Sequence, residues 1–177
     1  MLNFLNAAPW TLAYAQIDVK ETRLYINDGV AEQIEVKIGE GNFTWTETTN
    51  RDYILDRGLL DEVRDGDQAP VEVSFDILWD YIKGSSSTGA VPTIEEALKQ
   101  IGNASSWVSS DSDACRPYSV DLVLVYDPSC TTGDVEKITF SDFRWESLDH
   151  DLRGGSIACS GKCNIVVPTL TRGGQTP

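Results

Sequence analysis

Short runs in which apolar and polar residues alternate recur along most of the chain, and turn-forming residues separate them. Successive side chains of a β-strand point to opposite faces, so this period of two indicates strands with one face in a core and one in solvent. The pattern predicts an antiparallel, mainly β domain. The expected strands are Thr22 to Ile26, Gln33 to Ile38, Asn42 to Thr48, Val71 to Leu78, Ser119 to Tyr126, Glu136 to Phe140 and Ser156 to Val167.

Turn and helix signals stand between these runs. Asn27-Asp28-Gly29 predicts a hairpin between the first two strands, and glycines within residues 39–41 predict a second reversal, so an antiparallel meander would open the domain. One helix is indicated: Thr93 is a potential N-cap, Glu96 stands where a capping box needs it, and Gly102 ends the apolar stripe. The stripe is expected to pack the helix on the sheet.

The size and charge of the chain limit what it can do. Its 177 residues, 41% of them hydrophobic, fit a single domain over residues 1–177. The net charge of −14 disfavours specific binding of nucleic acid, which needs basic patches. No apolar run approaches the ~20 residues that cross a bilayer, and Met1 to Ala15 lacks the basic start of a secretory signal. We therefore expect no membrane segment, and synthesis and retention in the cytoplasm.

The four cysteines are best explained as packing residues. Cys159 and Cys163 occupy alternate positions of one expected strand, so both thiols should point inward, roughly 13 Å apart and too far for a disulfide. Cys115 and Cys130 bracket another strand, and none of the spacings matches a zinc site. We expect buried, reduced thiols, with a disulfide between strands or a metal site as the alternatives.

The sequence contains no recognisable catalytic or cofactor-binding motif. The one histidine, His150, lies between two acids, but no nucleophile motif is near it, and a histidine in a surface turn is the simpler interpretation. Asp65-Gly66-Asp67 and Asp111-Ser112-Asp113 lack the further ligands of an EF-hand and are expected to be ordinary turns. We predict no catalytic residue, no cofactor and no metal, and the chain is not expected to be an enzyme.

An acidic segment from Asp56 to Asp67, closed by Pro70, interrupts the strand pattern. It combines five acids and two arginines with three apolar residues, which is too charged for a core and too apolar for a solvated linker. We predict an extended loop near residues 50–70 that protrudes and binds a partner. Arg172 to Pro177 are expected to form a flexible C-terminal tail.

This region resembles the major tail tube proteins of long-tailed (siphovirus-type) bacteriophages, and two later stretches are also similar to that family. Together the similar stretches span about residues 40 to 165. They are Asp56-Arg57-Gly58 through Arg64-Asp65-Gly66-Asp67, Pro70-Val71-Glu72-Val73, Phe75-Asp76 with Trp79, Pro92-Thr93 with Glu96-Ala97-Leu98, and Asp142-Phe143-Arg144 with Leu148 to Gly155.

The resemblance implies a tail-tube-like domain, an antiparallel β-sandwich or partial barrel with one flanking α-helix. It implies a structural virion protein whose copies form hexameric rings, stacked into a tube that conducts phage DNA during ejection. The implied partners are other copies of the chain, the tape measure, terminator and tail-tip proteins, and DNA in transient, non-specific passage, but no membrane. The implied location is the tail of the virion, after assembly in the host cytoplasm.

In such a ring the loop from Tyr53 to Asp67 would reach a neighbouring subunit or ring. Arg57 and Arg64 are predicted to pair with acids of an adjacent copy, because arginine suits charged interface contacts. An acidic lumen would let DNA slide without being held, so an excess of Asp and Glu is expected at lumen-facing strand positions. The candidate interface residues are Asp56, Arg57, Asp61, Glu62, Arg64 and Asp67.

The sequence is also compatible with two other functions. A tail terminator or head-tail adaptor ring can share the fold, but would be present as a single ring. A monomeric carbohydrate-binding β-sandwich is the alternative from another class, because tryptophans can stack on sugars. Trp45 and Trp79 fall within strand patterns and are expected in the core, which leaves Trp10, Trp107 and Trp145 as candidate sugar platforms.

Overall fold

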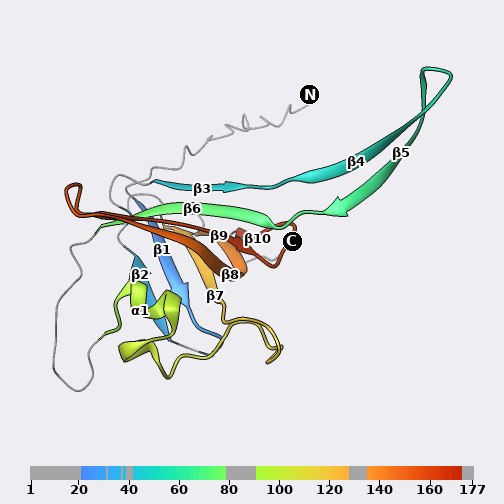
Figure 1. Ribbon diagram of the computed structural model, residues 1–177. Coiled ribbons are helices and arrows are strands. Elements are labelled where there is room, and N and C mark those ends of the chain that lie inside the picture. Colours follow the sequence, from blue (N-terminus) through green and yellow to red (C-terminus); the bar gives the residue numbers. More distant parts are fainter. Residues whose placement is uncertain are drawn as a thin grey trace, which may run out of the picture.

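The computed structural model describes residues 21–30, 32–36, 38, 42–78, 91–127 and 135–172. These residues form mainly antiparallel strands with one short α-helix and no closed barrel, which confirms the predicted class (Figure 1). The elements are β1 (Thr22–Asn27), β2 (Gln33–Val36), β3 (Phe43–Thr46), β4 (Thr49–Asp56), β5 (Leu59–Gln68), β6 (Val71–Leu78), α1 (Ile94–Lys99), the 3-10 turn η3 (Gly102–Ala104), β7 (Val120–Tyr126), β8 (Glu136–Asp151), β9 (Ser156–Cys163) and β10 (Thr169–Arg172).

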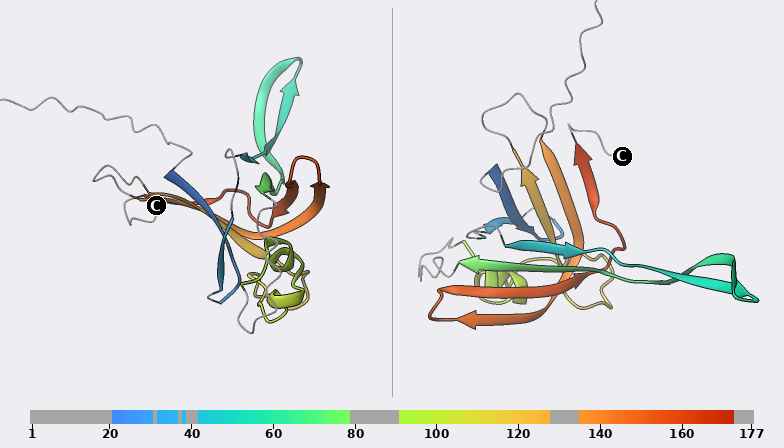
Figure 2. Two further views of the ribbon diagram at one scale, coloured as in Figure 1. Left: turned by 90° about the vertical axis from the view of Figure 1, so that its left-hand side faces the viewer. Right: turned by 90° about the horizontal axis from the view of Figure 1, so that it is seen from above.

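One sheet contains eight of these strands in the order β2-β1-β7-β8-β9-β6-β3, with β10 paired to β8. The long strand β8 joins its two parts. The first half of β8 pairs with β7 and β10, and the second half, from Phe143 onward, pairs with β9. Figure 2 shows that β8 curves, so β2-β1-β7 and β9-β6-β3 lie on two sides of a bent sheet.

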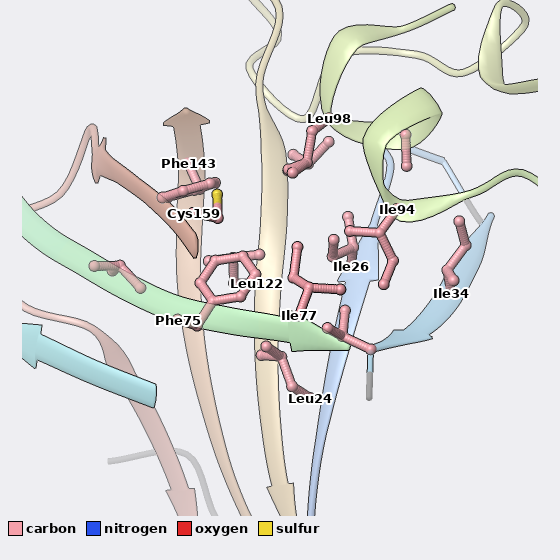
Figure 3. Close-up of a cluster of buried hydrophobic side chains, with 14 of the residues drawn as sticks. Leu24, Ile26, Ile34, Phe75, Ile77, Ile94, Leu98, Leu122, Phe143 and Cys159 are labelled. Carbon is pink, nitrogen blue, oxygen red and sulfur yellow. The ribbon is translucent and has the colours of Figure 1, made fainter. Parts of the chain in front are cut away.

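The core fills the inside of this bend. Alternate residues of β6 from Val71 to Ile77 are buried, and they pack with residues of β1, β7, β8 and β9. Figure 3 shows Phe75, Leu122, Ile77 and Ile26 in one cluster that extends to Ile94 of α1. Each large side chain that is fully buried contributes roughly 1.5–3 kcal/mol of hydrophobic free energy. A single apolar cluster therefore holds both parts of the sheet and the helix together.

The helix begins where its capping signal predicts. The Thr93 hydroxyl accepts a hydrogen bond from the Glu96 N–H (3.2 Å), and the Glu96 carboxylate accepts one from the Thr93 N–H (2.9 Å). The expected end at Gly102 is late, because Gln100 already adopts a left-handed conformation with φ of 55°. The expected packing of the stripe is confirmed, and its buried residues are Ile94, Ala97 and Leu98.

The seven expected strands all occur, but several ends differ. The strand expected over Glu136 to Phe140 continues to Asp151, and the one expected to reach Val167 ends at Cys163. In β8 the partner register shifts after Trp145 by one extra residue, so the apolar positions change phase there and the period of two is lost. The alternation also fails to predict β10, which has only four residues.

The expected opening meander is wrong. β2 pairs with β1 as the turn signal predicts, but β3 pairs with β6 at the opposite edge of the sheet. Aromatic packing accounts for this placement, because the Phe43 ring lies 5.9 Å from that of Phe75 and 5.4 Å from that of Phe140. Residues 39–41, where the second reversal is expected, lie outside the described residues.

Two of the cysteines behave as predicted. Cys159 and Cys163 are buried free thiols, and burial raises the pKa of each to about 12. Cys115 is exposed, which corrects the expectation of a buried thiol, because it lies in a turn where its N–H donates to the Asp113 carboxylate (3.0 Å). Cys130 lies outside the described residues.

Candidate assembly surfaces

The segment near residues 50–70 is a β-hairpin and not the expected loop. β4 and β5 form a hairpin, here called the arm, which projects from the rest of the molecule (Figures 1 and 2). Arg57 and Gly58 form its turn with φ of 50° and 84°, and a two-residue type I′ turn needs positive φ at both positions. Every residue of its strands is exposed except the half-buried Gly66.

One face of the arm carries a run of exposed apolar residues. Residues paired across an antiparallel hairpin share a face, so Tyr53 and Val63 lie beside Leu55 and Leu60. Tyr53, Leu55 and Leu60 are 63%, 62% and 61% exposed. An isolated two-stranded ribbon is marginally stable in water, and a contiguous exposed apolar face is typical of an interaction surface. The arm therefore has the features of a partner-binding element.

All six candidate interface residues lie on the arm, but the arginines have partners within the chain. Arg57 lies 3.5 Å from Asp56, and Arg64 lies 2.9 Å from Glu62. Asp61 is the extra residue of a β-bulge, opposite no residue of β4. These exposed pairs contribute little to stability and leave the charges accessible. The six are Asp56, Arg57, Asp61, Glu62, Arg64 and Asp67.

A second surface, here called the acidic face, lies on the outer side of β3, β6, β9 and the second half of β8. Its residues alternate with core residues along β6, and cross-strand pairing extends the face to the other strands. Thr44, Thr46 and Ser160 line a groove of about 310 Å³ at its centre. Five carboxylates and one ammonium belong to this face, namely Glu72, Asp76, Glu146, Asp149 and Asp151, with Lys162. Arg144 pairs with Lys162 in the same row, and its guanidinium donates to Asp111 and to the Pro117 carbonyl.

The same four strands end in two edges that no other described strand pairs. β3 has β6 on one side only, and β8 beyond Phe143 has β9 on one side only. Every neighbouring pair from β3 through β6 and β9 to β8 is antiparallel, so the two edge strands run in opposite directions. Each edge offers N–H and C=O groups to a further strand.

The bend of β8 is fixed by polar contacts around Asp142. This residue has a φ of 57°, uncommon for a side chain other than glycine, at a one-residue shift in the pairing with β7. Its N–H donates to the Asp121 carboxylate (3.0 Å), and its own carboxylate accepts from the Ser110 hydroxyl (3.1 Å). Burial raises the pKa of Asp121 above its ordinary value.

The segment Asp111-Ser112-Asp113 is more than the ordinary turn that was expected. Asp111 is 9% exposed and accepts from Arg144 (2.7 Å) and Arg116 (3.2 Å), which ties the segment to β8. The N–H of Asp113, and then the Arg144 guanidinium, hold the pKa of Asp111 below its ordinary value. Asp65-Gly66-Asp67 is also no turn, because it lies within β5.

His150 lies on β8, which corrects the expectation of a turn. Its Nε2 is 3.5 Å from Oε1 of Glu95 on α1, so it contacts the helix. Among the described residues, no group of three or more His, Cys, Asp or Glu side chains is placed to hold a metal ion. In the same part of the chain, no helix is long and apolar enough to span a bilayer.

The tryptophans differ from the expectation in two places. Trp45 is 39% exposed and not a core residue, because β3 is an edge strand. Trp107, a candidate sugar platform, is 4% exposed and belongs to the core cluster. Trp145 is 39% exposed, as a platform requires, while Trp10 and Trp79 lie outside the described residues.

The sequence predicts that the segment near residues 50–70 projects, but not that it is a hairpin, and it does not predict the open edges or the second half of β8. The alternation of Glu72 and Asp76 with Val71, Val73 and Phe75 is the signal that could have located the acidic face. The bulge after Trp145 hides the rest of it.

No protein-family model and no curated protein matches this sequence. Among solved structures, a chain in the cryo-EM structure of the sheath/tube terminator of an extracellular contractile injection system (PVC), in its extended state, is similar over 84% of this chain and 93% of its own, at 9% identity and a TM-score of 0.47. A chain in the baseplate of the anti-feeding prophage (AFP) is similar over 88% of this chain and 95% of its own, at 6% identity and a TM-score of 0.45. At these TM-scores neither similarity assigns a function to this chain.

Proposed function

We propose that this chain is a structural, non-enzymatic subunit of a phage tail tube, in which hexameric rings stack to form the conduit for DNA. The observation that carries the proposal is the pair of open edges on the four-stranded part of the sheet. Around a ring axis, β3 of one copy would pair with β8 of the next, and the antiparallel alternation would continue because β3 and β8 run in opposite directions. Closing the edges in this way removes a liability of the single copy.

The acidic face supports a role as a DNA conduit. Pairing of the edges would bring the acidic faces of all copies onto one wall, and we assign that wall to the lumen. Five carboxylates outnumber the Lys162 ammonium and the Arg144 guanidinium, which already pairs with Asp111, so the face repels phosphates. DNA therefore releases no counterions by binding there and can slide. The carboxylates of the acidic face are therefore the ones that we propose face the lumen.

The arm supports stacking or contact between subunits. Its apolar residues are exposed in a single copy and would be covered by a neighbouring subunit or ring. Head-to-tail contacts of this kind can close into rings or continue as a filament. The partners would be other copies and the tape measure, terminator and tail-tip proteins, and the location the virion tail.

Electron microscopy of the purified protein at high concentration, together with particles from any source that encodes it, tests the proposal. Hollow tubes or six-fold rings are expected. Single rings that never stack, present once per particle, would instead indicate a terminator or adaptor ring. Monomers alone, with the chain absent from the tail shaft, would contradict the proposal and favour the carbohydrate-binding alternative, for which glycan-dependent quenching of tryptophan fluorescence is the check.

A further inference from the structure

A cleft of about 290 Å³ lies beside the outer edge of β8, against α1. The Lys99 ammonium lies 5.9 Å from the centroid of the Trp145 ring, a cation–π distance, and Trp145 is 39% exposed. Lys99 and Arg144 bring positive charge to a chain whose net charge is −14. The cleft is lined by Leu98, Lys99, Pro117, Tyr118, Arg144 and Trp145.

Strands β3, β6, β9 and the second half of β8 form a four-stranded part of the sheet, and the cleft lies at its β8 edge. The opposite edge, β3, carries two side chains whose chemistry complements that of the cleft. Trp45 on β3 is 39% exposed, and its indole N–H donates to the carboxylate of Glu47 (3.0 Å). This hydrogen bond holds a large apolar ring and a negative charge side by side at the edge. The cleft offers an aromatic ring and two cations, and the edge offers an aromatic ring and a carboxylate.

The register of the sheet places Trp45 and Trp145 in the same row of paired residues. Trp45 pairs with Val73, Val73 with Gly161, and Gly161 with Trp145, so the two tryptophans end one row across four strands and share its core-facing side. Three strand spacings separate β3 from β8, about 14 Å at the usual spacing. The Trp45 ring packs against Phe140 of its own copy, with centroids 5.5 Å apart, and is not among the residues that line that copy's cleft.

We propose that Trp45 and Glu47 of one copy occupy the cleft formed by Lys99, Arg144 and Trp145 of the neighbouring copy. This inference rests on the proposed ring and names the contact that fixes its register. When β3 of one copy pairs with β8 of the next and these rows are aligned, Trp45 contacts Trp145. The Glu47 carboxylate then lies beside the Lys99 ammonium and the Arg144 guanidinium. Lys99 already donates to Glu95, and Arg144 donates to Asp111 and to the carbonyls of Pro117 and Asp142. An ammonium has three N–H donors and a guanidinium five, so each can bond a further carboxylate.

The occupant is a second copy because the cleft's features match the other edge of this chain. Charge selects Glu47 in this position, since a carboxylate beside two cations is favoured and a cation there is repelled. Aromatic burial adds affinity, because tryptophan is among the residues that dominate interface energies. The contact would also set the register between copies, which a ladder of backbone hydrogen bonds alone leaves free to slip.

A cysteine pair tests the contact in the full-length chain. In a background with Cys115→Ser and Cys130→Ser, Glu47→Cys is combined with Lys99→Cys and oxidised under mild conditions. The buried Cys159 and Cys163 stay unreactive, because burial raises the pKa of both thiols to about 12. A disulfide within one copy would leave the chain monomeric on a gel, so only disulfides between copies produce covalent oligomers. Glu47→Cys with Glu35→Cys is the matched control, because Glu35 lies on β2 away from the cleft.

A ladder of covalent oligomers from the test pair, with the control pair remaining monomeric, is the expected result. Trp45→Ala in the test pair should abolish the ladder, while Trp45→Phe should retain part of it. Rings or tubes in the microscope without the ladder would leave the proposed function standing and overturn this contact. Cross-linking of the control pair as strong as that of the test pair would overturn it as well. A chain that stays monomeric and uncross-linked at high concentration, and that is absent from the tail shaft of particles, would contradict both proposals.

Discussion

The carboxyl group of Asp121, at the bend of β8, makes the stability of the folded state depend on pH. Burial raises the pKa of Asp121 above its ordinary 3.8, so the folded state binds a proton there more tightly than the unfolded chain. The stabilisation from this proton is fully present below pH 3.8 and is lost as the pH rises through the folded pKa. At neutral pH the ionised Asp121 therefore opposes folding.

Asp121→Asn should raise the melting temperature at about pH 7, and the gain should vanish near about pH 3, where the native carboxyl is also neutral. The amide oxygen can still accept the hydrogen bond from the Asp142 N–H. Glu35→Gln, an exposed site on β2, controls for the loss of one charge from an acidic chain. Calorimetry across this pH range makes the comparison. An equal gain in both variants would show that net charge, and not burial, causes the effect.

Substitution of two leucines distinguishes the core from the exposed arm. Leu122 is fully buried on β7, and Leu59 is 75% exposed on the arm. Leu122→Ala should lower the free energy of unfolding by about 2–5 kcal/mol, because it leaves a cavity among packed side chains. Leu59→Ala should change it by no more than about 0.5 kcal/mol. Urea unfolding of the two variants checks this, and a similar cost at both sites would contradict the exposed position of the arm.

Among the elements, the arm contributes to contacts and not to the core. Removing residues 50–67 and joining Thr49 to Gln68 through Asn-Gly should preserve a hairpin, because these two residues are paired and Asn-Gly suits a two-residue turn. We expect the melting temperature of the monomer to stay nearly unchanged and tubes or rings to be lost. Arg57→Ala with Arg64→Ala is the milder variant, and it should weaken assembly and its salt sensitivity. Tubes from the shortened chain would show that the arm has no part in assembly.

Strands with an unbroken period of two could be predicted from the sequence, and strands without it could not. In β6 every second residue enters the core, and its bounds match the expectation at both ends. The arm buries neither face, so nothing selects alternation there, and Arg57-Gly58 lacks the usual Asn or Asp at the first position of such a turn. In β8 the bulge at Glu146 changes the phase of the pattern, so its second half, and with it an open edge, is invisible to a period of two.

On the scale of the whole molecule, three surfaces belong to one geometry. The open edges flank the acidic face, and the arm continues from the β3–β6 end of the same sheet, where β3 leads to β4 and β5 leads to β6 (Figure 1). Pairing of the edges would thus form a wall, orient its charge and aim the arms in one common direction. The sequence supplies the charge and the arm, while the combination exists only in the folded chain.

The charge of that wall should decide whether a tube retains DNA. Glu72→Lys with Asp149→Lys places cations on the acidic face, and Glu32→Lys with Glu35→Lys makes the same change in net charge on exposed residues elsewhere. Tubes of the first variant should retain short DNA at about 50 mM salt and release most of it at about 200 mM, because phosphate binding releases counterions. Wild-type tubes should retain none at either salt, and control tubes should resemble them if DNA enters the lumen. Equal retention by both variants would mean that DNA binds the outside, and that the acidic face does not line the channel.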